Sequence, residues 1–415
     1  MAIKKLKVTN FKSFKLLDVE LGNFNVVVGA NASGKSNFIQ TFKFIRDIAT
    51  LGLDNAVSLQ GSEYLINLGI SPPQPLCVKL NADIEPGVFF RHRQGVAFKI
   101  TEINYEFSLN FSRKNASYEI EKDCLILKID LLKFKMGQKK LPKVGKKLGS
   151  GAINIESDKG KIKFDFDMPK DISIKDSDIL PPFFMERRIP TKTLLLQTPY
   201  FFLPPIEESL SGASIYDFDP KMSKRAVSVA GKSELEEDGS NLSLVLKSIV
   251  ENENKKKKFS NLIKDLLPFV DDLDTDKFAD KSLLFKLREN YFKGVYFPAS
   301  FISDGTVNIS ALLIALYFER KNLIIIEEPE RNIHPYLISK VMDMMKDASK
   351  NKQIIVTTHS PEVVKHSGLE NLLLVSRDKD GFSTISRPSE KKEVQIFLKN
   401  ELGLDDLYVQ NLLGD

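Results

Sequence analysis

The pattern of apolar and polar positions near the start of the chain predicts strands followed by a helix. Residues 3–9 mix apolar and polar side chains as a half-exposed strand does, and residues 16–28 end in a dense apolar run typical of a buried central strand. A Gly-rich turn follows. From about 36 to 49, apolar side chains recur at helical spacing, which predicts a helix with one buried face: Phe38, Ile39, Phe42 and Ile45.

From about 75 to 198 the apolar residues repeat with a period of two, between clusters of Gly, Asn and Lys, which predicts an antiparallel β arm. Residues 190–235 include two adjacent prolines and have no clear period, so we expect a loop or a short helix there. Apolar spacings of three and four predict a helical stretch over 240–268. Its four lysines at 255–258 are typical of a solvated helix face, and a DNA contact is the alternative.

The C-terminal part of the chain alternates between predicted strands and helices. The order is strand 283–288, strand 294–299, helix 306–320, strand 322–327, helix 335–349, strand 353–358, helix 361–366 and strand 371–376. Strands that alternate with helices indicate parallel βαβ units. The chain has no internal repeat and no sustained heptads, which argues against a long coiled coil.

Composition sets broad limits on the kind of protein. With 415 residues and 42% apolar content, the chain has room for two domains or for one large domain with an insertion. No run approaches the ~18 apolar residues of a membrane helix, and the lysine-rich start leads into strand-like residues, so we expect a soluble, cytoplasmic protein without a membrane partner. Cys77 and Cys124 lack metal-ligand spacing and are expected to be reduced core thiols. The net charge of +5 permits nucleic-acid binding without requiring it.

The turn between the apolar strand and the first helix matches the pattern G-x-x-x-x-G-K-[ST] at residues 29–36. Its glycines let backbone N–H groups converge on phosphate oxygens, Lys35 reaches the β and γ phosphates, and the Ser36 hydroxyl binds Mg²⁺. A Gly-rich turn without a ligand is the alternative, which the strand-to-helix context disfavours. We therefore predict ATP contacts at Gly29, Asn31, Ala32, Ser33, Gly34, Lys35, Ser36 and Asn37.

A second motif is an apolar strand that ends in two acids, Glu327 and Glu328, as in a Walker B motif. The carboxyl end of such a strand lies beside the phosphate loop in parallel sheets. We predict that Glu327 holds Mg²⁺, directly or through water, and that Glu328 polarises the attacking water. The alternative is that the acids only end a strand and begin a turn, although adjacent carboxylates at a buried strand end would repel each other.

A third motif is the apolar strand 353–358, which His359 follows directly. A neutral imidazole there can hydrogen-bond the γ-phosphate or the attacking water, so we predict a catalytic switch role for His359. A purely structural histidine is the alternative. The position of His359 as the third element in this order of motifs favours the switch.

Ser303, Asp304, Gly305 and Thr306 precede an apolar helix about twenty residues before the acidic strand. They have the composition of an N-terminal cap with exposed amides, and a helix start of this kind binds anions. The turn resembles the ABC signature motif, which implies that it completes the ATP site of a neighbouring subunit in a head-to-tail dimer. An ordinary helix cap is the alternative.

Together, these motifs resemble the RecF/SMC-like family of AAA-type ATPases, over about residues 1–70 and 235–415. The resemblance implies an α/β fold: an ABC-type P-loop ATPase head with a central, mostly parallel sheet, plus an antiparallel β arm and a helical insertion. The family's N-terminal strand and turn match residues 8–14, which implies that Asn10 and Lys12 lie near the nucleotide. Gln60 is the candidate for the family's Mg²⁺-sensing glutamine. Glu327 departs from the aspartate that is usual at its position.

The resemblance also implies a division of the chain into segments. Residues 1–74, with the Walker A motif, and residues 283–415, with the signature, Walker B and switch histidine, form the two halves of the head. Residues 75–235 form the β-rich arm, and residues 236–282 form the helical insertion.

What the resemblance implies for function is an ATPase that uses ATP and Mg²⁺ as a homodimer or higher homo-oligomer. The chain is similar to the ATPase parts of overcoming-lysogenization-defect nucleases and to stand-alone ATPases of two-gene anti-phage systems, which implies a separate effector protein, a nuclease or toxin. Two roles stay open. One is a DNA-associated motor, clamp or sensor subunit in anti-phage defence or DNA repair; the other is a nucleotide-gated scaffold that sequesters or releases the effector through the arm. The signature sequence and the long arm disfavour a transporter ATPase.

Overall fold

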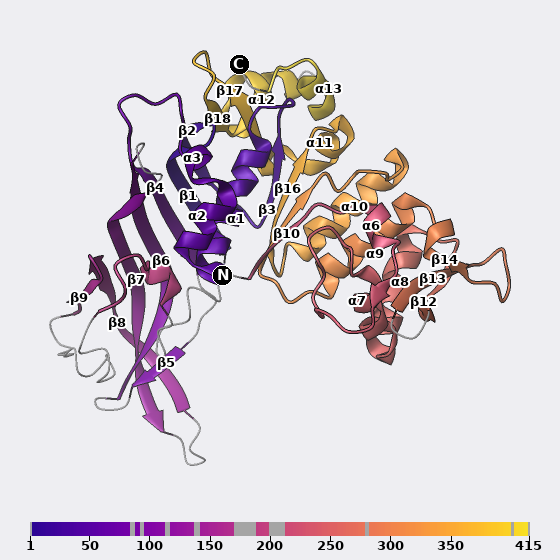
Figure 1. The fold of residues 1–415 in the computed structure, drawn as a ribbon, viewed down its shortest axis with the longest axis horizontal. Helices are drawn as coiled ribbons and strands as arrows, with labels where there is room; N and C mark the ends of the chain where they lie inside the picture. The colour runs from indigo at the N-terminus through magenta and orange to yellow at the C-terminus, as the bar shows by residue number, and fades with distance from the viewer. Residues whose placement is uncertain are drawn as a thin grey trace. The chain divides into compact units, whose positions relative to one another are not determined.

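The computed structural model describes residues 2–83, 88–91, 95–112, 117–136, 142–169, 188–198, 212–278, 282–399 and 402–413. The chain divides into two compact units, each described by itself below. The first unit consists of Met1–Leu21, Ser36–Ala213 and Ser376–Ile385, and the second consists of Gly22–Lys35, Ser214–Val375 and Ser386–Asp415. In Figure 1 the first unit is mainly indigo and magenta, and the second is mainly orange and yellow.

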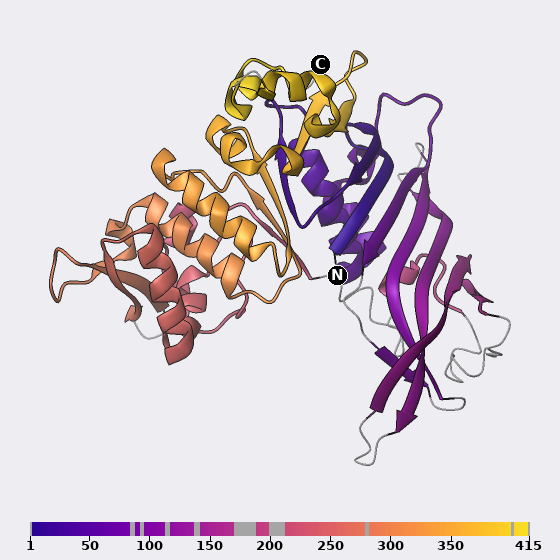
Figure 2. The ribbon, with the colours of Figure 1, turned by 180° about the vertical axis from the view of Figure 1, so that it is seen from behind.

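The first unit is built on one eight-stranded sheet with the strand order β2-β1-β4-β6-β7-β8-β9, in which β5 also pairs with β6. All these neighbours are antiparallel, as the period of two predicts. Figures 1 and 2 show the long strands β6, β7 and β8 lying side by side. The strands are β1 (Ala2–Phe11), β2 (Phe14–Glu20), β4 (Leu76–Asp83), β5 (Val88–Arg91), β6 (Val96–Phe111), β7 (Tyr118–Met136), β8 (Pro142–Asp158) and β9 (Lys161–Asp167).

Three helices of the first unit follow the Gly-rich turn: α1 (Lys35–Leu51), α2 (Leu53–Gln60) and α3 (Ser62–Leu65). The predicted apolar face of α1 is buried, and its Phe44 ring lies 5.9 Å from the Phe11 ring of β1. The sheet and α1 therefore share one apolar core. The strands β1 and β2 join the same sheet as the predicted arm, because β1 pairs with β4 over most of its length. The four-segment division of the chain stays a prediction.

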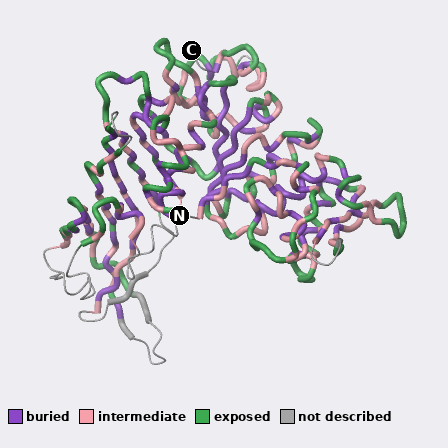
Figure 3. The backbone as a smooth tube through the Cα atoms, in the orientation of Figure 1, coloured by how far each residue is buried: buried purple, intermediate pink, exposed green. Residues whose placement is uncertain are grey.

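The second unit contains the parallel strands β15 (Leu323–Glu327), β16 (Gln353–Thr358), β3 (Phe24–Val28) and β17 (Leu372–Arg377), in this spatial order. Figure 3 colours the centre of this sheet as buried, in agreement with the dense apolar runs that predict it. In register, Val28 lies opposite Thr358, and Thr357 lies opposite Glu327. The carboxyl ends of β15, β16 and β3 thus meet at one edge of the sheet.

The helices of this unit are α6 (Pro220–Ser223), α7 (Leu242–Val250), α8 (Glu253–Leu266), α9 (Asp304–Tyr317), α10 (Pro335–Ala348), α11 (Pro361–Ser367), α12 (Lys392–Lys399) and α13 (Leu404–Val409). The predicted helical stretch 240–268 is two helices, α7 and α8, because the chain turns at Glu251 and Asn252. Within the lysine run, Lys258 lies over the Tyr317 and Phe318 rings and Lys256 pairs with Asp272, as a solvated helix face allows.

The predicted strand 283–288 is confirmed, whereas only residues 297–298 of the predicted strand 294–299 form a strand. Both lie outside the parallel sheet, in a small antiparallel sheet with the order β11-β13-β12 and with β14 on β13. Its strands are β11 (Val227–Ser228), β12 (Val270–Phe278), β13 (Ser282–Glu289) and β14 (Phe297–Pro298). In addition, residues 190–235 hold a strand at the edge of the parallel sheet, β10 (Ala213–Tyr216), whose Tyr216 ring stacks on Phe218.

The remaining short elements are η2 (Leu195–Gln197), η3 (Ala299–Phe301), η4 (Leu369–Asn371), η5 (Pro388–Glu390) and β18 (Ser383–Ser386). Among the described helices, none combines the length and the apolar composition that crossing a membrane requires.

Candidate functional site

The phosphate-loop sequence leaves β3 at Gly29 and enters α1 at Lys35. A Cβ atom at Gly29 would lie 2.2 Å from the backbone oxygen of Val375, so only glycine fits there. Ala32 has a left-handed backbone with φ of 61°. The Lys35 ammonium donates to the backbone oxygens of Gly29 at 2.6 Å and Ala30 at 3.1 Å. The side chain therefore lies over the loop that its motif assigns to phosphates.

The ammonium group of Lys35 is partly buried. Burial lowers the pKa of Lys35, while the carboxylates of Glu328 and Glu330 act in the opposite direction. An ammonium that has lost part of its hydration gains most from a nearby anion. The loop is thus prepared for a strongly negative ligand.

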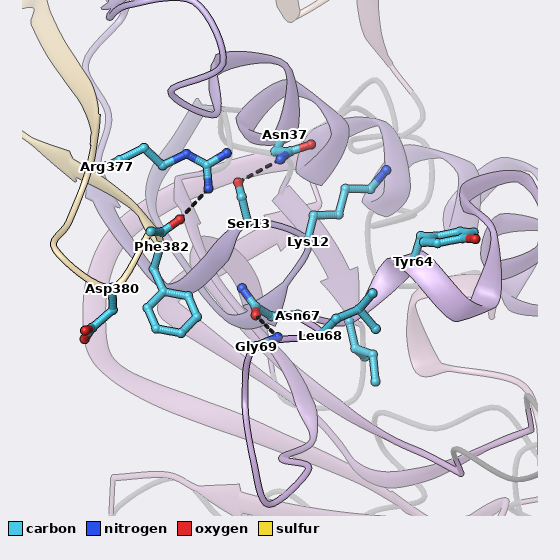
Figure 4. A pocket seen from close by; sticks show the side chains of 12 residues that line it. Lys12, Ser13, Asn37, Tyr64, Asn67, Leu68, Gly69, Arg377, Asp380 and Phe382 are labelled. Carbon is cyan, nitrogen blue, oxygen red and sulfur yellow. Dashed lines mark hydrogen bonds between the residues drawn. The ribbon is translucent and has the colours of Figure 1, made fainter.

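In the first unit, the start of α1 and the turn after β1 surround a cavity of about 820 Å³ (Figure 4). The turn contributes Lys12 and Ser13, α1 contributes Asn37, and the hairpin before β18 contributes Arg377 and Phe382. The Asn37 amide donates to the Ser13 hydroxyl at 2.7 Å, and in Figure 4 these side chains point toward each other. Burial, and then the charge of Lys43, lowers the pKa of Lys12. The cavity therefore offers amide, hydroxyl and cationic groups beside one aromatic ring.

Two sequence-predicted residues of this unit lie outside the cavity lining. Asn10 is buried. Its side-chain oxygen accepts a hydrogen bond from the Asn67 backbone N–H at 3.0 Å, and its side-chain nitrogen donates to the Gln74 backbone oxygen. Its side chain thus joins segments of the unit, while Lys12, two residues later, reaches the cavity. Gln60 is the last residue of α2. The roles predicted for Asn10 and Gln60 stay predictions.

The edge of the parallel sheet brings the second and third motifs together. The Glu328 carboxylate contacts the His359 imidazole, with Oε1 and Nδ1 2.8 Å apart, and its other oxygen accepts from Arg331 at 3.0 Å. Burial acts to raise the pKa of Glu328, but Arg331 and His359 outweigh it, so the pKa lies below its usual value. Glu328 is therefore a carboxylate at neutral pH, as a general base must be.

The backbone of Glu328 is held in a conformation that side chains rarely adopt, with φ of 45°. Its N–H donates to the Thr357 oxygen at 2.9 Å, which fixes the turn immediately after β15. Left-handed backbone at a non-glycine residue persists only where the surroundings enforce it, and such residues cluster at functional sites. The turn aims the Glu328 side chain at His359 on the neighbouring strand end.

Glu330 and Arg331 complete this cluster, and the motif analysis did not single them out. The Glu330 carboxylate accepts from the Thr358 hydroxyl, and burial raises the pKa of Glu330. Arg331 links Glu328 to Asp217, to which it donates at 2.8 Å. The Glu-Pro-Glu-Arg sequence is visible in the chain, but its partners are not adjacent to it, so no local pattern reveals these contacts.

The signature-like turn begins α9 as a true helix cap. The Ser303 hydroxyl accepts from the Thr306 amide at 3.2 Å. Asp304 forms an ion pair with Lys224 of α6. A Cβ atom on Gly305 would lie 2.5 Å from the backbone oxygen of Asn332, so glycine lets the turn after β15 approach the helix start. The start of α9 is thus held against the segment that carries Glu328 and Arg331.

Residues 1–364 match the family described as AAA ATPase domain. The chain belongs to this family. As an AAA ATPase domain protein it carries a nucleotide-binding P-loop fold, which agrees with the parallel sheet and the loop at residues 29–36.

This AAA ATPase domain protein is also similar to an uncharacterized protein, MJECL43, of Methanocaldococcus jannaschii, at 28% identity over 93 residues. The matched part is 22% of this chain and 24% of that protein, so the chain spans about a quarter of the length of this relative.

Among solved structures, SMC head domains are similar to the AAA ATPase domain protein. A head bound to the C-winged helix domain of ScpA has a TM-score of 0.47 at 16% identity, covering 93% of this chain and 97% of that chain. A Pyrococcus furiosus head with an extended coiled coil, bound to the C-terminal domain of ScpA, has a TM-score of 0.46 at 14% identity, covering 97% and 100%. The Thermotoga maritima head domain has a TM-score of 0.41 at 15% identity, covering 93% and 99%.

The residues of the AAA ATPase domain protein provide oxygen donors of the kind that Mg²⁺ prefers. Ser36 is exposed in the first turn of α1, and Glu327 is half-buried at the end of β15. A hydroxyl and a carboxylate, with the remaining positions filled by water and phosphate oxygens, match the ligands of nucleotide-bound Mg²⁺. Each of these two groups is by itself an oxygen donor of the kind that binds Mg²⁺.

Proposed function

We propose that this AAA ATPase domain protein binds Mg-ATP and hydrolyses it, with Glu328 as the general base and His359 as the residue that responds to the γ-phosphate. The observation that supports this most directly is the Glu328–His359 contact of 2.8 Å at the sheet edge where β3 delivers the phosphate loop. An ionised carboxylate beside an imidazole takes the proton of a water molecule and keeps it oriented.

In this proposal the loop binds the phosphates through its backbone N–H groups, from Gly29, Asn31, Ala32, Ser33 and Gly34, together with Lys35. Ser36 and Glu327 would hold Mg²⁺, which neutralises negative charge on the β and γ phosphate oxygens when bound. Asn37 follows Ser36 directly and lines the cavity of the first unit. We propose that Asn37 and Lys12 also contact ATP, as the motifs of the sequence imply.

The start of α9 supports a head-to-tail dimer. Ser303 caps the helix, and the exposed amides of a helix start favour an anion. The lysine partner of Asp304 offsets a charge that would otherwise repel phosphate. In a dimer, this turn in one copy would contact the triphosphate on the phosphate loop of the other. ATP would then hold the dimer closed, and hydrolysis would open it.

For the wider role, we propose an ATP-gated subunit of an anti-phage defence or DNA repair system that acts with a separate effector protein. Charge pairing on the sheet of the first unit favours effector docking over DNA binding there. Among the described residues, eight of its lysines each have a carboxylate oxygen within 3.4 Å: Lys4, Lys5, Lys7, Lys79, Lys122, Lys128, Lys147 and Lys163. Lysines whose charge is already paired attract the phosphates of DNA less strongly.

Substitution Lys35→Ala tests the ATP site. We expect it to abolish measurable ATP binding, because it removes the cation from the loop. We expect the fold to stay intact, since the hydrogen bonds that the ammonium donates are to backbone oxygens of the loop itself. Isothermal calorimetry with Mg-ATP measures the affinity. Lys340→Ala is the control, as Lys340 binds a backbone oxygen on the distant α8 segment. Equal ATP affinity of the Lys35 variant and the wild type would remove the basis of the proposal.

A further inference from the structure

Two hydrogen bonds join the turn after β15 to the end of β16. In the first, a backbone bond, the Glu328 N–H donates to the Thr357 oxygen at 2.9 Å. In the second, a side-chain bond, the Thr358 hydroxyl donates to the Glu330 carboxylate. Glu328 itself takes part in the first bond, and His359 directly follows the donor of the second. The two bonds therefore act on the two partners of the 2.8 Å contact between Glu328 and His359.

The Thr358 hydroxyl is both a donor and an acceptor. Its proton goes to Glu330, and its oxygen accepts the backbone N–H of Ser360 at 2.9 Å. Because the bond to Glu330 keeps the proton away from Ser360, the lone pairs of the oxygen are left to accept that N–H. The chain is thus held on both sides of His359, before it at the Thr358 hydroxyl and after it at the Ser360 N–H.

His359 lies at a corner of the chain, between the end of β16 and the first residue of α11, Pro361. Ser360 is the N-cap residue of α11, and its side chain makes no capping hydrogen bond. Thr358 is fully buried, whereas the His359 side chain is 54% exposed. Packing therefore fixes Thr358 more firmly than the imidazole, whose direction depends on the backbone of this corner and on its hydrogen bonds.

Glu330 is well suited to hold the hydroxyl. Its Oε2 atom is buried and has no hydrogen-bond partner within the described part of the chain, while the other oxygen accepts from Thr358. Burial raises the pKa of Glu330, and the hydrogen bond from Thr358 acts in the opposite direction. A buried carboxylate loses more free energy than a neutral group when it loses a donor. The hydroxyl therefore has a strong reason to stay on Glu330.

We propose that Glu330 and Thr358 are positioning residues for His359: the carboxylate holds the hydroxyl, the hydroxyl holds the Ser360 N–H, and the imidazole between them is directed at Glu328. The effect on hydrolysis rests on the proposed function, since it needs ATP on the loop. The placement of His359 needs no nucleotide, so it can be tested separately.

Nuclear magnetic resonance of the imidazole Cε1–H groups tests this placement without nucleotide. The chain has four histidines, and the His359 signal is identified by its loss in His359→Gln. Thr358→Val keeps the shape of the side chain and removes the hydroxyl. We expect it to shift the His359 signal by more than the linewidth. In addition, Glu328→Gln should shift this signal in the wild type and much less in the Thr358→Val background, because the contact is then already lost.

A pair of substitutions at Glu330 separates the hydrogen bond from the charge. Glu330→Gln and Glu330→Met both remove the charge, but only glutamine keeps an oxygen that accepts the hydroxyl. We expect the His359 signals of the two variants to differ, and to coincide when Thr358→Val is added to both. Coinciding signals in the presence of Thr358 would show that Glu330 does not act through the hydroxyl, and the inference would be wrong.

Two further variants serve as controls. Thr358→Ser keeps the hydroxyl and should give the wild-type His359 signal, with a lower melting temperature because a buried methyl group is lost. The Ser243 hydroxyl is also fully buried and accepts a backbone N–H, that of Phe285 at 3.1 Å, in the small antiparallel sheet. Ser243→Ala should lower the melting temperature and leave the His359 signal unchanged. If Thr358→Val behaved in the same way, its role would be confined to folding.

The second experiment measures phosphate release at saturating Mg-ATP. We expect turnover to fall by about 10- to 10²-fold in Thr358→Val, because a misdirected imidazole no longer orients Glu328, and to recover in Thr358→Ser. Wild-type turnover in Thr358→Val, together with a shifted His359 signal, would overturn the inference. A wild type that hydrolyses no ATP but shows the expected His359 signals would instead overturn the proposed function and support the placement of His359.

Discussion

The Glu328 side chain has both carboxylate oxygens in use, one on His359 and one on Arg331. Arg331 is 42% exposed, and ion pairs at such exposure are worth about 0–1 kcal/mol. Water can therefore displace the guanidinium at little cost. In the proposed mechanism, the contact with His359 keeps the carboxylate oriented while its other oxygen takes up the proton of the attacking water. The chemistry thus requires only that Arg331 yields to water.

Substitution Glu328→Gln keeps the shape of the side chain and removes its basicity. We expect ATP turnover to fall by about 10²- to 10⁴-fold, the usual contribution of a general base, while ATP affinity stays near the wild-type value. The trapped nucleotide should also increase the dimer fraction. Phosphate release measures turnover, and light scattering with ATP measures the dimer.

Glu362→Gln provides the control for that substitution, because Glu362 also contacts a histidine at 3.2 Å, but its partner is His366 within α11 and not His359. Its turnover should match the wild type. Unchanged turnover in Glu328→Gln would show that another group accepts the proton.

Sequence alone identifies those candidate site residues that belong to a local sequence motif. Lys35, Glu328 and His359 each follow an apolar strand, and the parallel order of those strands brings their ends together as predicted. Asp217 and Tyr408 were not predicted. They contact the site from 114 and 379 residues away, so the contacts arise from tertiary packing that no short pattern records.

At the scale of elements, the predicted types of long periodic segments were mostly confirmed, and the errors come from short strands. The strand β14 has only two residues, and its pairing with β13 rather than with the parallel sheet depends on neighbours such as β12. β10 lies at a sheet edge in a segment with no apolar period. The pairing partners of such short strands depend on tertiary contacts within the unit, so local periodicity does not identify them.

The Asp123 side chain links β7 to η2 and β6 of the first unit through hydrogen bonds. Its carboxylate is buried in β7 and accepts from the Leu195 amide of η2 at 2.7 Å and from the Tyr105 hydroxyl of β6 at 2.8 Å. Burial raises the pKa of Asp123 to about 7, although both hydrogen bonds act in the opposite direction. The folded state thus binds a proton more tightly than the unfolded chain, whose aspartates titrate near 3.9.

The stability that this proton contributes is complete below pH about 4 and is lost as the pH rises through 7. Asp123→Asn resembles the neutral carboxyl and does not titrate. Between pH 5 and pH 8.5 we expect the stability of the variant to rise relative to that of the wild type, by an amount on the order of 1–3 kcal/mol. Urea unfolding at both pH values measures the difference.

Asp158→Asn is the control for that experiment, because the Asp158 side chain is 58% exposed and pairs with Lys163 at the sheet margin. It should show no gain at high pH. If Asp123→Asn had the same stability relative to the wild type at pH 5 and pH 8.5, the buried proton would play no part in holding η2 to the sheet.

At the scale of the whole molecule, the net charge permits DNA binding, whereas the local pairing of charges favours a protein partner. The chain carries a net charge of +5, which permits DNA binding. On the sheet of the first unit, however, each of the lysines named above is paired; Glu106, for example, lies 3.0 Å from Lys79 and 2.9 Å from Lys122. Lysines that are paired with carboxylates in this way release fewer counterions from DNA. It suits a protein partner, which can exchange these ion pairs one for one.

The dependence of DNA binding on salt separates the two roles. Neutralising 6–10 phosphates lowers affinity by about 10³- to 10⁵-fold between 50 and 200 mM salt. For this protein with Mg-ATP we expect a loss of only about tenfold, which corresponds to roughly two phosphates. Fluorescence anisotropy with a duplex of random sequence measures it, and Lys35→Ala, which blocks the ATP response, gives the nucleotide-independent background. If DNA affinity fell 10³-fold or more over this salt range in the wild type but not in the Lys35 variant, the ATP-bound state would be the DNA-binding state. Effector docking would then be rejected as its main role.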